Sequence, residues 1–218
     1  MAQRMTRREA IGRIGAVTGG AALLGRREAS AASGPPNIIF IMADDLGYGD
    51  IGCYGQQQIL TPNIDAMAAE GIRFTQCYAG SPVSSPSRCA LMTGYHAGHG
   101  SVPANYYPGL SADDVTVADV LKGRGYTTGA IGKWHLGATG TPGAPNQQGF
   151  DYWFGYDFGA RPRDYYPPLL SKNGRPVRIR ANEDGRENVY GPDLMTDKSL
   201  GFIRDNAGGP FFLYLAYS

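Results

Sequence analysis

The sequence is short of three things: cysteine, net charge and long apolar runs. Its three cysteines, Cys53, Cys77 and Cys89, cannot build the dense disulfide framework of a small secreted domain, although one bridge is possible in an exported chain. The net charge is +1 at pH 7; residues 1–31 alone carry +4, so the rest of the chain is slightly acidic at −3. That balance predicts no basic face of the kind that binds nucleic acid.

No apolar run is long enough to predict a stable membrane span, and the mildly apolar run at residues 14–24 is also too weak. An arginine pair, Arg7-Arg8, precedes that run, and the small residues Ala29-Ser30-Ala31 follow it. Residues 1–31 therefore predict a signal peptide that resembles a twin-arginine signal. The export machinery for folded proteins would then be a partner, and the destination periplasmic or secreted. A disordered basic tail is the alternative.

The remaining residues, 32–218, are expected to form one domain rich in glycine and proline, with apolar segments between the turns. Strands are expected at residues 37–43, 72–78, 126–131 and 210–217. Helices are expected at residues 61–70, 116–122 and 192–206. The continuous apolar run at 37–43 predicts a buried central strand of a parallel sheet. In the helix at 116–122, Val117, Val120 and Leu121 are expected to face the core.

Two adjacent carboxylates, Asp44 and Asp45, come directly after the first expected strand. The carboxyl ends of strands are where open α/β sheets place their active sites. Adjacent acids repel one another, so the pair is costly unless a cation holds it, and a hard divalent ion with oxygen ligands is the natural partner. A solvated acidic turn is the alternative for this pair.

The stretch Ser84–Gly94 reads Ser-Ser-Pro-Ser-Arg-Cys-Ala-Leu-Met-Thr-Gly and predicts a loop that turns into a short helix. Ser84 is expected just ahead of the helix N-terminus, where unpaired N–H groups and the helix dipole favour an anion. Arg88, one turn in, adds a positive charge and a planar fork of donors. A nucleophile could meet a tetrahedral oxyanion here. An ordinary capped helix with a solvated arginine is the alternative.

A third polar group follows the strand at 126–131, in the segment Gly-Lys-Trp-His-Leu-Gly at residues 132–137. Because they alternate after a strand, Lys133 and His135 are expected to point toward the same cleft. Lysine can bind an anionic oxygen as a point charge, and histidine can hydrogen-bond a nucleophile or move a proton. On the local sequence alone this segment is weak evidence, since tryptophan and histidine are often structural.

Two of these segments resemble the sulfatase family. The signature Cys/Ser-x-Pro-Ser-Arg-x-x-Leu-x-Thr-Gly is filled at every fixed position by residues 84–94, and Gly-Lys-Trp-His-Leu-Gly is a second strong match. In sulfatases the first signature residue is oxidised to formylglycine, whose hydrated aldehyde is the nucleophile. The resemblance therefore implies that role for Ser84, as in serine-type bacterial arylsulfatases, and catalytic roles for Arg88, Lys133 and His135.

The resemblance also implies a fold, a metal and partners. The expected fold is α/β, a mostly parallel sheet with helices on both faces, as in the alkaline-phosphatase superfamily. Calcium is the implied cofactor beside formylglycine, held by Asp44, Asp45 and the residue at position 84. The implied partners are a sulfate-ester substrate and the maturation enzyme that generates formylglycine.

The match covers about residues 36–218 and only the N-terminal part of the usual catalytic domain, so a C-terminally truncated chain with an unpaired apolar sheet edge is expected. The resemblance implies sulfate-ester hydrolysis. The alternatives are a phosphomonoester or phosphonate hydrolase of the same superfamily, with an unmodified Ser84 attacking phosphorus, and an inactive fragment or binding module. The sequence does not indicate which sulfate ester would be the substrate.

Overall fold

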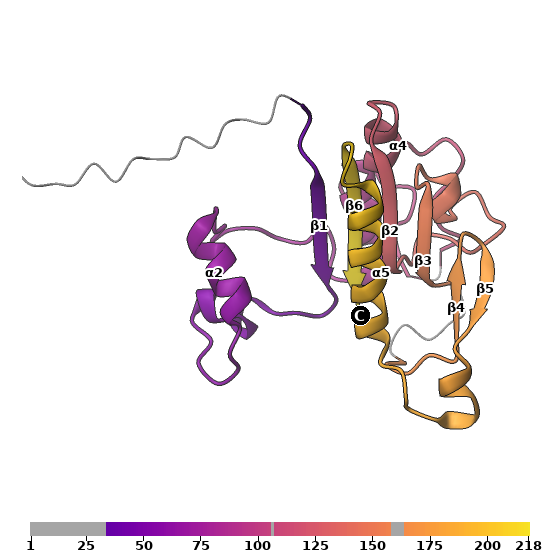
Figure 1. Cartoon of the computed structure of the whole chain (residues 1–218). Helices are drawn as coiled ribbons and strands as arrows, with labels where there is room; N and C mark the ends of the chain where they lie inside the picture. Colours follow the sequence, from indigo (N-terminus) through magenta and orange to yellow (C-terminus); the bar gives the residue numbers. More distant parts are fainter. Residues whose placement is uncertain (1–33, 106, 158–163) are drawn as a thin grey trace, which may run out of the picture. The chain divides into compact units, whose positions relative to one another are not determined.

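A computed structural model describes residues 34–105, 107–157 and 164–218 (Figure 1). The segment expected to be a signal peptide, residues 1–31, lies outside the described residues. In the described ranges, no helix is both long enough and apolar enough to cross a membrane. All three cysteines fall within these ranges, and none of them is in a disulfide there.

Six strands form one sheet in the order β1-β6-β2-β3-β4-β5 (Figure 1). Their bounds are β1 Ile38–Ala43, β2 Thr127–Lys133, β3 Tyr152–Tyr156, β4 Leu169–Lys172, β5 Arg175–Arg178 and β6 Phe211–Tyr217. The first four strands in that order pair in parallel, whereas β4 and β5 are added antiparallel. The sheet is therefore mixed and mostly parallel, which confirms the expected fold class.

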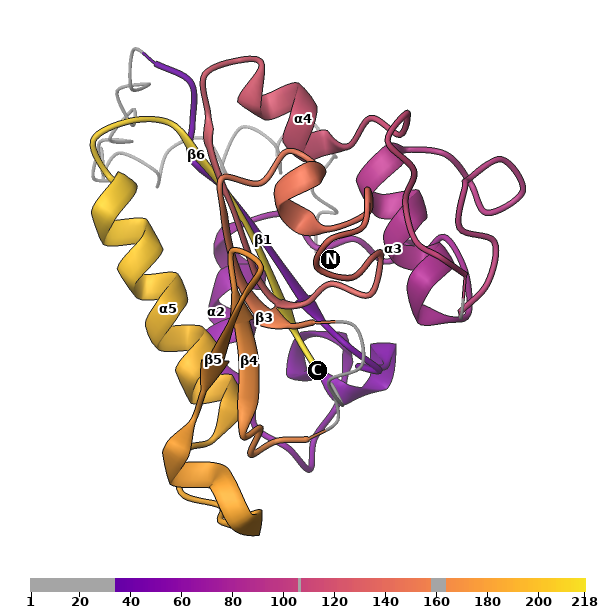
Figure 2. The same ribbon diagram turned by 90° about the vertical axis from the view of Figure 1, so that its right-hand side faces the viewer.

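The α-helices are α2 Pro62–Glu70, α3 Ser84–Thr93, α4 Val117–Lys122 and α5 Gly191–Asn206. Short 3-10 turns lie at η1 Tyr48–Asp50, η2 Gly52–Tyr54, η3 Pro145–Gln147 and η4 Arg180–Gly185. Figure 2 shows α5 on one side of the sheet and α3 and α4 on the other. Helices on both faces agree with the sequence prediction.

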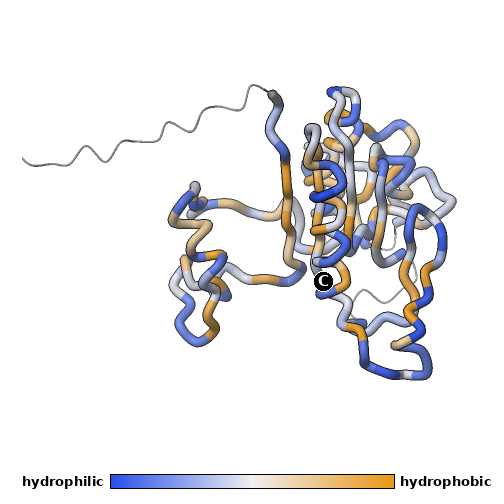
Figure 3. Tube along the Cα trace, viewed as in Figure 1, coloured by the Kyte–Doolittle hydropathy of each residue, from blue (hydrophilic) through white to orange (hydrophobic). Residues whose placement is uncertain are grey.

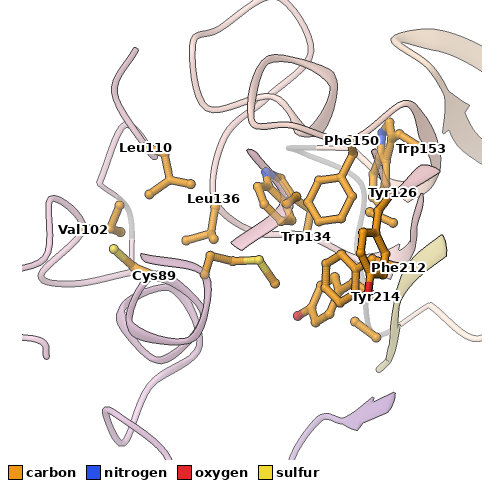
Figure 4. Packing of buried hydrophobic residues seen from close by; sticks show 14 residues of the cluster. Cys89, Val102, Leu110, Tyr126, Trp134, Leu136, Phe150, Trp153, Phe212 and Tyr214 are labelled. Atoms are coloured by element: carbon orange, nitrogen blue, oxygen red, sulfur yellow. The ribbon is translucent and has the colours of Figure 1, made fainter. Parts of the chain in front are cut away.

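Strand β6 contributes to both apolar clusters, because its successive side chains point to opposite faces of the sheet. Phe212 and Tyr214 join the cluster that packs under α3 and α4 (Figure 4), whereas Leu213 and Leu215 join the cluster under α5. Six of the seven residues of β6 are buried, and Tyr217 at its end is partly exposed. Two apolar layers therefore fix β6 from opposite sides, and the residues at its carboxyl end are held with it.

Strand β1 is not the central strand that its apolar run predicts. In the described sheet β1 pairs with β6 alone and forms an edge. Figure 3 shows hydrophobic residues along it, and Ile39 and Ile41 are 46% and 58% exposed. The described sheet thus has the unpaired apolar edge that was expected. A continuous apolar run shows that a strand can be buried on both of its faces. It does not show which segments, if any, cover those faces.

Two smaller expectations are also wrong. Residues 72–78 form no strand, and Phe74 and Tyr78 in that segment are 63% and 82% exposed. Apolar character alone does not make a strand, because a strand needs a neighbour to pair its backbone groups. In α4, Val117 and Val120 are exposed and Ala118 is the buried residue. Leu121 does pack against the core as expected, partly buried, so Ala118 and Leu121 together bring this six-residue helix onto it.

Asp151 joins the beginnings of β2 and β3. Its Oδ2 accepts hydrogen bonds from the backbone N–H and the hydroxyl of Thr128, both at 3.0 Å, and its Oδ1 lies 2.7 Å from Lys122 Nζ. Thr128 is fully buried. Partial burial of Asp151 opposes its ionisation, but Lys122 and the Thr128 donors outweigh it and lower the pKa of Asp151 from its usual value.

We expect Asp151→Ala to reduce the free energy of unfolding by about 1–2 kcal/mol, since the buried Thr128 N–H loses its acceptor. Because the folded-state pKa lies below the unfolded-state value, the carboxylate stabilises the fold above about pH 4 and loses that effect as the pH falls through the folded-state pKa. Urea midpoints at a series of acidic pH values should therefore fall more steeply for the native chain than for the variant.

Lys122→Met is the matched control, because it removes only the exposed ion pair. Its expected cost is below about 0.5 kcal/mol. Equal destabilisation in Asp151→Ala and Lys122→Met would contradict the assignment of the stability to the Thr128 hydrogen bonds.

Candidate active site

Three parallel strands bring their carboxyl ends to one edge of the sheet. Asp44 directly follows β1, Lys133 ends β2, and the Asp44 N–H donates to the carbonyl of Tyr217 at the end of β6, at 3.1 Å. A cavity of about 390 Å³ lies at this edge. Its lining includes Asp44, Asp45, Ser81, Ser84, Ser87, Arg88, Asn105 and Lys133.

Ser84 is the first residue of α3 and does not lie ahead of it, because the extended Val83 is the N-cap. Pro86 is the third helical residue, where its missing N–H is one of the groups that has no intrahelical partner. The N–H of Ser85 donates to Asn105 Oδ1 at 2.9 Å. Ser84 Oγ is thus presented to the cavity from a helix N-terminus whose neighbouring N–H is already used.

Arg88 is buried, with 1% of its surface exposed, so the alternative of a solvated arginine is wrong. Its Nε donates to Ser84 Oγ at 3.1 Å, and its Nη2 donates to Asp44 Oδ1 at 3.2 Å. Its Nη1 donates to the Lys133 carbonyl at 2.7 Å and to the Tyr214 hydroxyl at 2.8 Å. One guanidinium therefore connects α3 to the ends of β1 and β2 and to the middle of β6.

Asp44 has cations on both carboxylate oxygens. Oδ1 accepts from Arg88, and Oδ2 forms an ion pair with the buried Lys133 ammonium. Burial of Asp44 opposes ionisation, but Lys133 and then Arg88 outweigh it and hold the pKa of Asp44 below its usual value. Asp45 beside it has a left-handed backbone, with φ of 57°, and lines the same cavity. The carboxylate at position 44 is thus compensated by side chains of this chain.

The imidazole of His135, two residues beyond the end of β2, lies beside the hydroxyl of Ser84. Its Nδ1 lies 3.1 Å from Ser84 Oγ. Burial, and then the positive charges of Lys133 and Arg88, lower the pKa of His135, with Asp44 acting in the opposite direction. A neutral imidazole is therefore favoured, and it can accept a proton from a hydroxyl at position 84.

Lys133 and His135 do converge, but simple strand alternation is not the cause. Strand β2 ends at Lys133, and His135 has a left-handed backbone with φ of 61°. Between them Trp134 is buried, and its Nε1 donates to the Gly143 carbonyl at 2.7 Å. The buried indole fixes the turn that directs His135 toward Ser84.

The donor chemistry of the cavity suits a hard cation only in part. Asp44, Asp45 and Ser84 present oxygen ligands there, as Ca²⁺ prefers, but such an ion takes about six to eight oxygens. Within the described ranges, no group of three or more His, Cys, Asp and Glu side chains could hold a metal ion. The residues present therefore fit calcium by type and supply a fraction of its ligands.

Two residues of the site were missed by sequence reasoning. Asn105 lies in a Gly/Pro-rich loop and carries no local pattern that distinguishes it from an ordinary turn residue. Tyr214 lies inside an apolar run, where a single tyrosine indicates a core position. Its burial raises the pKa of Tyr214 although Arg88 opposes this, so the phenol stays neutral. The two-residue period of a strand could have predicted that Tyr214 lies on the face of β6 that α3 covers.

Comparisons with known proteins agree with this geometry. The sulfatase family model matches residues 36–218. Human arylsulfatase A is 38% identical over 216 residues, which cover 85% of this chain and 41% of the relative. Human N-acetylgalactosamine-6-sulfatase is 36% identical over 214 residues, which cover 86% of this chain and 40% of the relative.

Among solved structures, one determined with its substrate D-glucosamine-2-N,6-O-disulfate superposes with a TM-score of 0.70 at 35% identity, covering 84% of this chain and 34% of that one. The chain spans about two fifths of the length of the curated relatives, at 41% and 40%. The family match runs through every strand of the described sheet and all the residues around Ser84. The chain belongs to the sulfatase family.

Proposed function

We propose that this chain carries the nucleophile and its immediate supports in a sulfuric ester hydrolase. The observation that carries the proposal is the position of Ser84 Oγ, 3.1 Å from Arg88 Nε and 3.1 Å from His135 Nδ1. A cation, a proton acceptor and a helix N-terminus meet at one oxygen. That combination suits an attacking hydroxyl and the negative charge that develops around it.

Formylglycine at position 84, in its hydrated form, would supply two hydroxyls on one carbon. One would attack sulfur as the sulfur–oxygen bond to the alcohol breaks, and deprotonation of the other would expel sulfate and return the aldehyde, which water then hydrates again. His135 Nδ1 is placed to accept a proton at that position. Lys133 lines the cavity with its ammonium paired to Asp44, and that positive charge could attract an anionic sulfate oxygen. Arg88 holds residue 84 against the ends of the strands. The released products are an alcohol and sulfate.

A calcium ion would be held partly by Asp44 and Asp45 and would polarise the sulfate by charge. We further propose that a maturation enzyme converts Ser84 before export, and that the segment at residues 1–31 directs the folded chain to the periplasm or outside the cell through the twin-arginine machinery. The substrate class is a sulfate ester. Sulfated sugars are one such class, in view of the relative solved with glucosamine disulfate.

A phosphate or phosphonate monoester hydrolase is the second candidate, and the Ser84–His135 contact favours it as well. A neutral histidine 3.1 Å from an unmodified serine hydroxyl could activate that hydroxyl toward phosphorus. The two candidates differ in the chemical state of residue 84, so they can be separated directly.

The test is peptide mass spectrometry combined with paired substrates. Trypsin should release residues 74–88, between Arg73 and Arg88, and conversion of Ser84 should leave that peptide lighter by two hydrogens. We expect the lighter peptide together with hydrolysis of 4-nitrophenyl sulfate. An unchanged peptide with hydrolysis of 4-nitrophenyl phosphate alone would overturn the proposal in favour of the second candidate. A converted peptide without hydrolysis of either ester would refute both.

A further inference from the structure

Tyr214 is a rigid side chain at the centre of the sheet. It lies on β6 between Phe40 of β1 and Ala130 of β2, and 1% of its surface is exposed. Its ring packs edge-on to Trp134, with centroids 6.4 Å apart and an interplanar angle of 77° (Figure 4). The ring of Phe150 lies 6.5 Å from it. Aromatic neighbours and the strand backbone therefore fix where the phenol oxygen lies.

The hydroxyl of Tyr214 has both of its hydrogen-bonding functions in use. The oxygen accepts from Arg88 Nη1 at 2.8 Å, and the O–H donates to Met42 Sδ at 3.5 Å. The sulfur of Met42 on β1 thus orients the proton away from the guanidinium. A lone pair of the oxygen is left facing Arg88, as a fixed acceptor.

The guanidinium of Arg88 has four hydrogen-bond partners, Asp44 on Nη2 among them, and the Tyr214 contact helps to set its plane. The two Nη1 protons go to the Lys133 carbonyl and to Tyr214, while Nε points to Ser84 Oγ. A guanidinium is planar, so fixing Nη1 also fixes the direction of the Nε proton. Removal of the phenol oxygen would leave a buried Nη1 proton without its acceptor. The remaining hydrogen bonds to Ser84, the Lys133 carbonyl and Asp44 would then hold the plane of the group less tightly.

The Tyr214 hydroxyl, which accepts from Arg88 Nη1, is neutral, so it does not reduce the positive charge beside residue 84. A carboxylate here would compensate the positive charge of Arg88 a second time, after Asp44. A phenol satisfies the N–H without adding negative charge. The positive charge of Arg88 stays available to the oxygen at position 84, where negative charge develops in the proposed reaction.

We propose that Tyr214 is a positioning residue for the nucleophile: its hydroxyl orients the Arg88 guanidinium so that Nε meets the oxygen of residue 84. Tyr214 is not itself among the residues that line the cavity, and it acts on residue 84 through Arg88, which does line it. The effect on turnover rests on the proposed function, whereas the effect on the orientation of Arg88 does not.

The test compares Tyr214→Phe with Tyr126→Phe, which removes a hydroxyl from the same buried cluster and leaves the Arg88 hydrogen bonds in place. Kinetics with 4-nitrophenyl sulfate are normalised to the fraction of converted residue 84. We expect kcat to fall about tenfold in Tyr214→Phe with KM within about twofold of the native value, because ground-state binding is untouched. Tyr126→Phe should leave both constants unchanged.

Hydrogen exchange of the Arg88 Nε–H, followed by ¹⁵N NMR of arginine-labelled protein, is the second measurement. We expect exchange at least about tenfold faster in Tyr214→Phe, and no change in Tyr126→Phe. Unchanged exchange and unchanged kcat would overturn the proposal, as would equal effects in the two variants. Faster exchange in a chain that hydrolyses no sulfate ester would uphold the positioning of Arg88 and refute the proposed function instead.

Discussion

If the chain acts in the proposed sulfuric ester hydrolase, Ser84→Ala is expected to abolish sulfate-ester hydrolysis, with kcat/KM lower by at least about 10⁴-fold, as is usual when an enzyme loses its nucleophile. Alanine has no oxygen to oxidise, so no formylglycine can form, and nothing remains for His135 and Arg88 to act upon. The fold should survive, because the hydrogen bonds of this hydroxyl with Arg88 and His135 stabilise it by only about 1 kcal/mol each. Initial rates with 4-nitrophenyl sulfate and a thermal melt check both halves of this prediction.

Ser85→Ala is the matched control, because it deletes the same hydroxyl one residue along the same helix. Ser85 is buried, and it is the backbone N–H of this residue that bonds Asn105. Its replacement should leave kcat/KM within about threefold of the native value, as expected for a small change that removes no reacting group. Turnover retained in Ser84→Ala, or an equal reduction in the two variants, would refute the nucleophile assignment.

The convergence of the site residues could be predicted from the sequence for a simple reason. Asp44 and Lys133 were both placed at strand ends, and parallel strands bring their carboxyl ends to one edge. The strand expected at residues 72–78 does not form, so Ser84 reaches this edge as the first residue of α3 and not from a strand end. In the structure, Asp44, Arg88, Lys133 and Ser84 all line one cavity. The family signature added the chemistry of each residue, which spacing alone does not specify.

What the sequence could not predict was how these charges are compensated. The two acids were expected to need a metal ion, yet the structure satisfies Asp44 with Arg88 and Lys133. Such pairing depends on contacts between residues 44 to 89 positions apart in the chain. A pattern among neighbouring residues in the sequence does not predict contacts between residues that are so far apart in the chain. The burial of Arg88 was hidden for the same reason, since three of its partners lie on distant segments.

The errors on β1 and on residues 72–78 have a different source. Both segments are apolar enough to be strands, and periodicity alone specifies neither a pairing partner nor a cover. Strand β1 pairs with β6, whereas residues 72–78 have no strand to pair with in the described sheet. Strand formation is a property of two segments together, so the prediction for each depended on information outside it.

Arg88→Met is expected to destabilise the fold by about 3 kcal/mol, near the lower end of the range for breaking one partner of a buried ion pair. Methionine keeps the apolar length of the side chain but leaves the Lys133 carbonyl, the Tyr214 hydroxyl and Asp44 Oδ1 without their donor. Asp44 keeps its ion pair with Lys133, which holds the cost below the upper end of that range. Urea denaturation measures the free energy, and kcat should fall by at least about 10²-fold with the removal of the cation.

Arg88→Lys separates charge from geometry at the same position. A lysine ammonium is a point charge and cannot reach the ends of two strands and α3 together, so the variant should still be less stable by about 1–2 kcal/mol. Arg178→Met serves as the surface control, because its pair with Glu183 at 3.3 Å is exposed and should contribute less than about 0.5 kcal/mol. An Arg88→Lys variant as stable and as active as the native chain would show that charge alone matters at residue 88. The planar fork that joins β1, β2, β6 and α3 would then have no role in holding the site together.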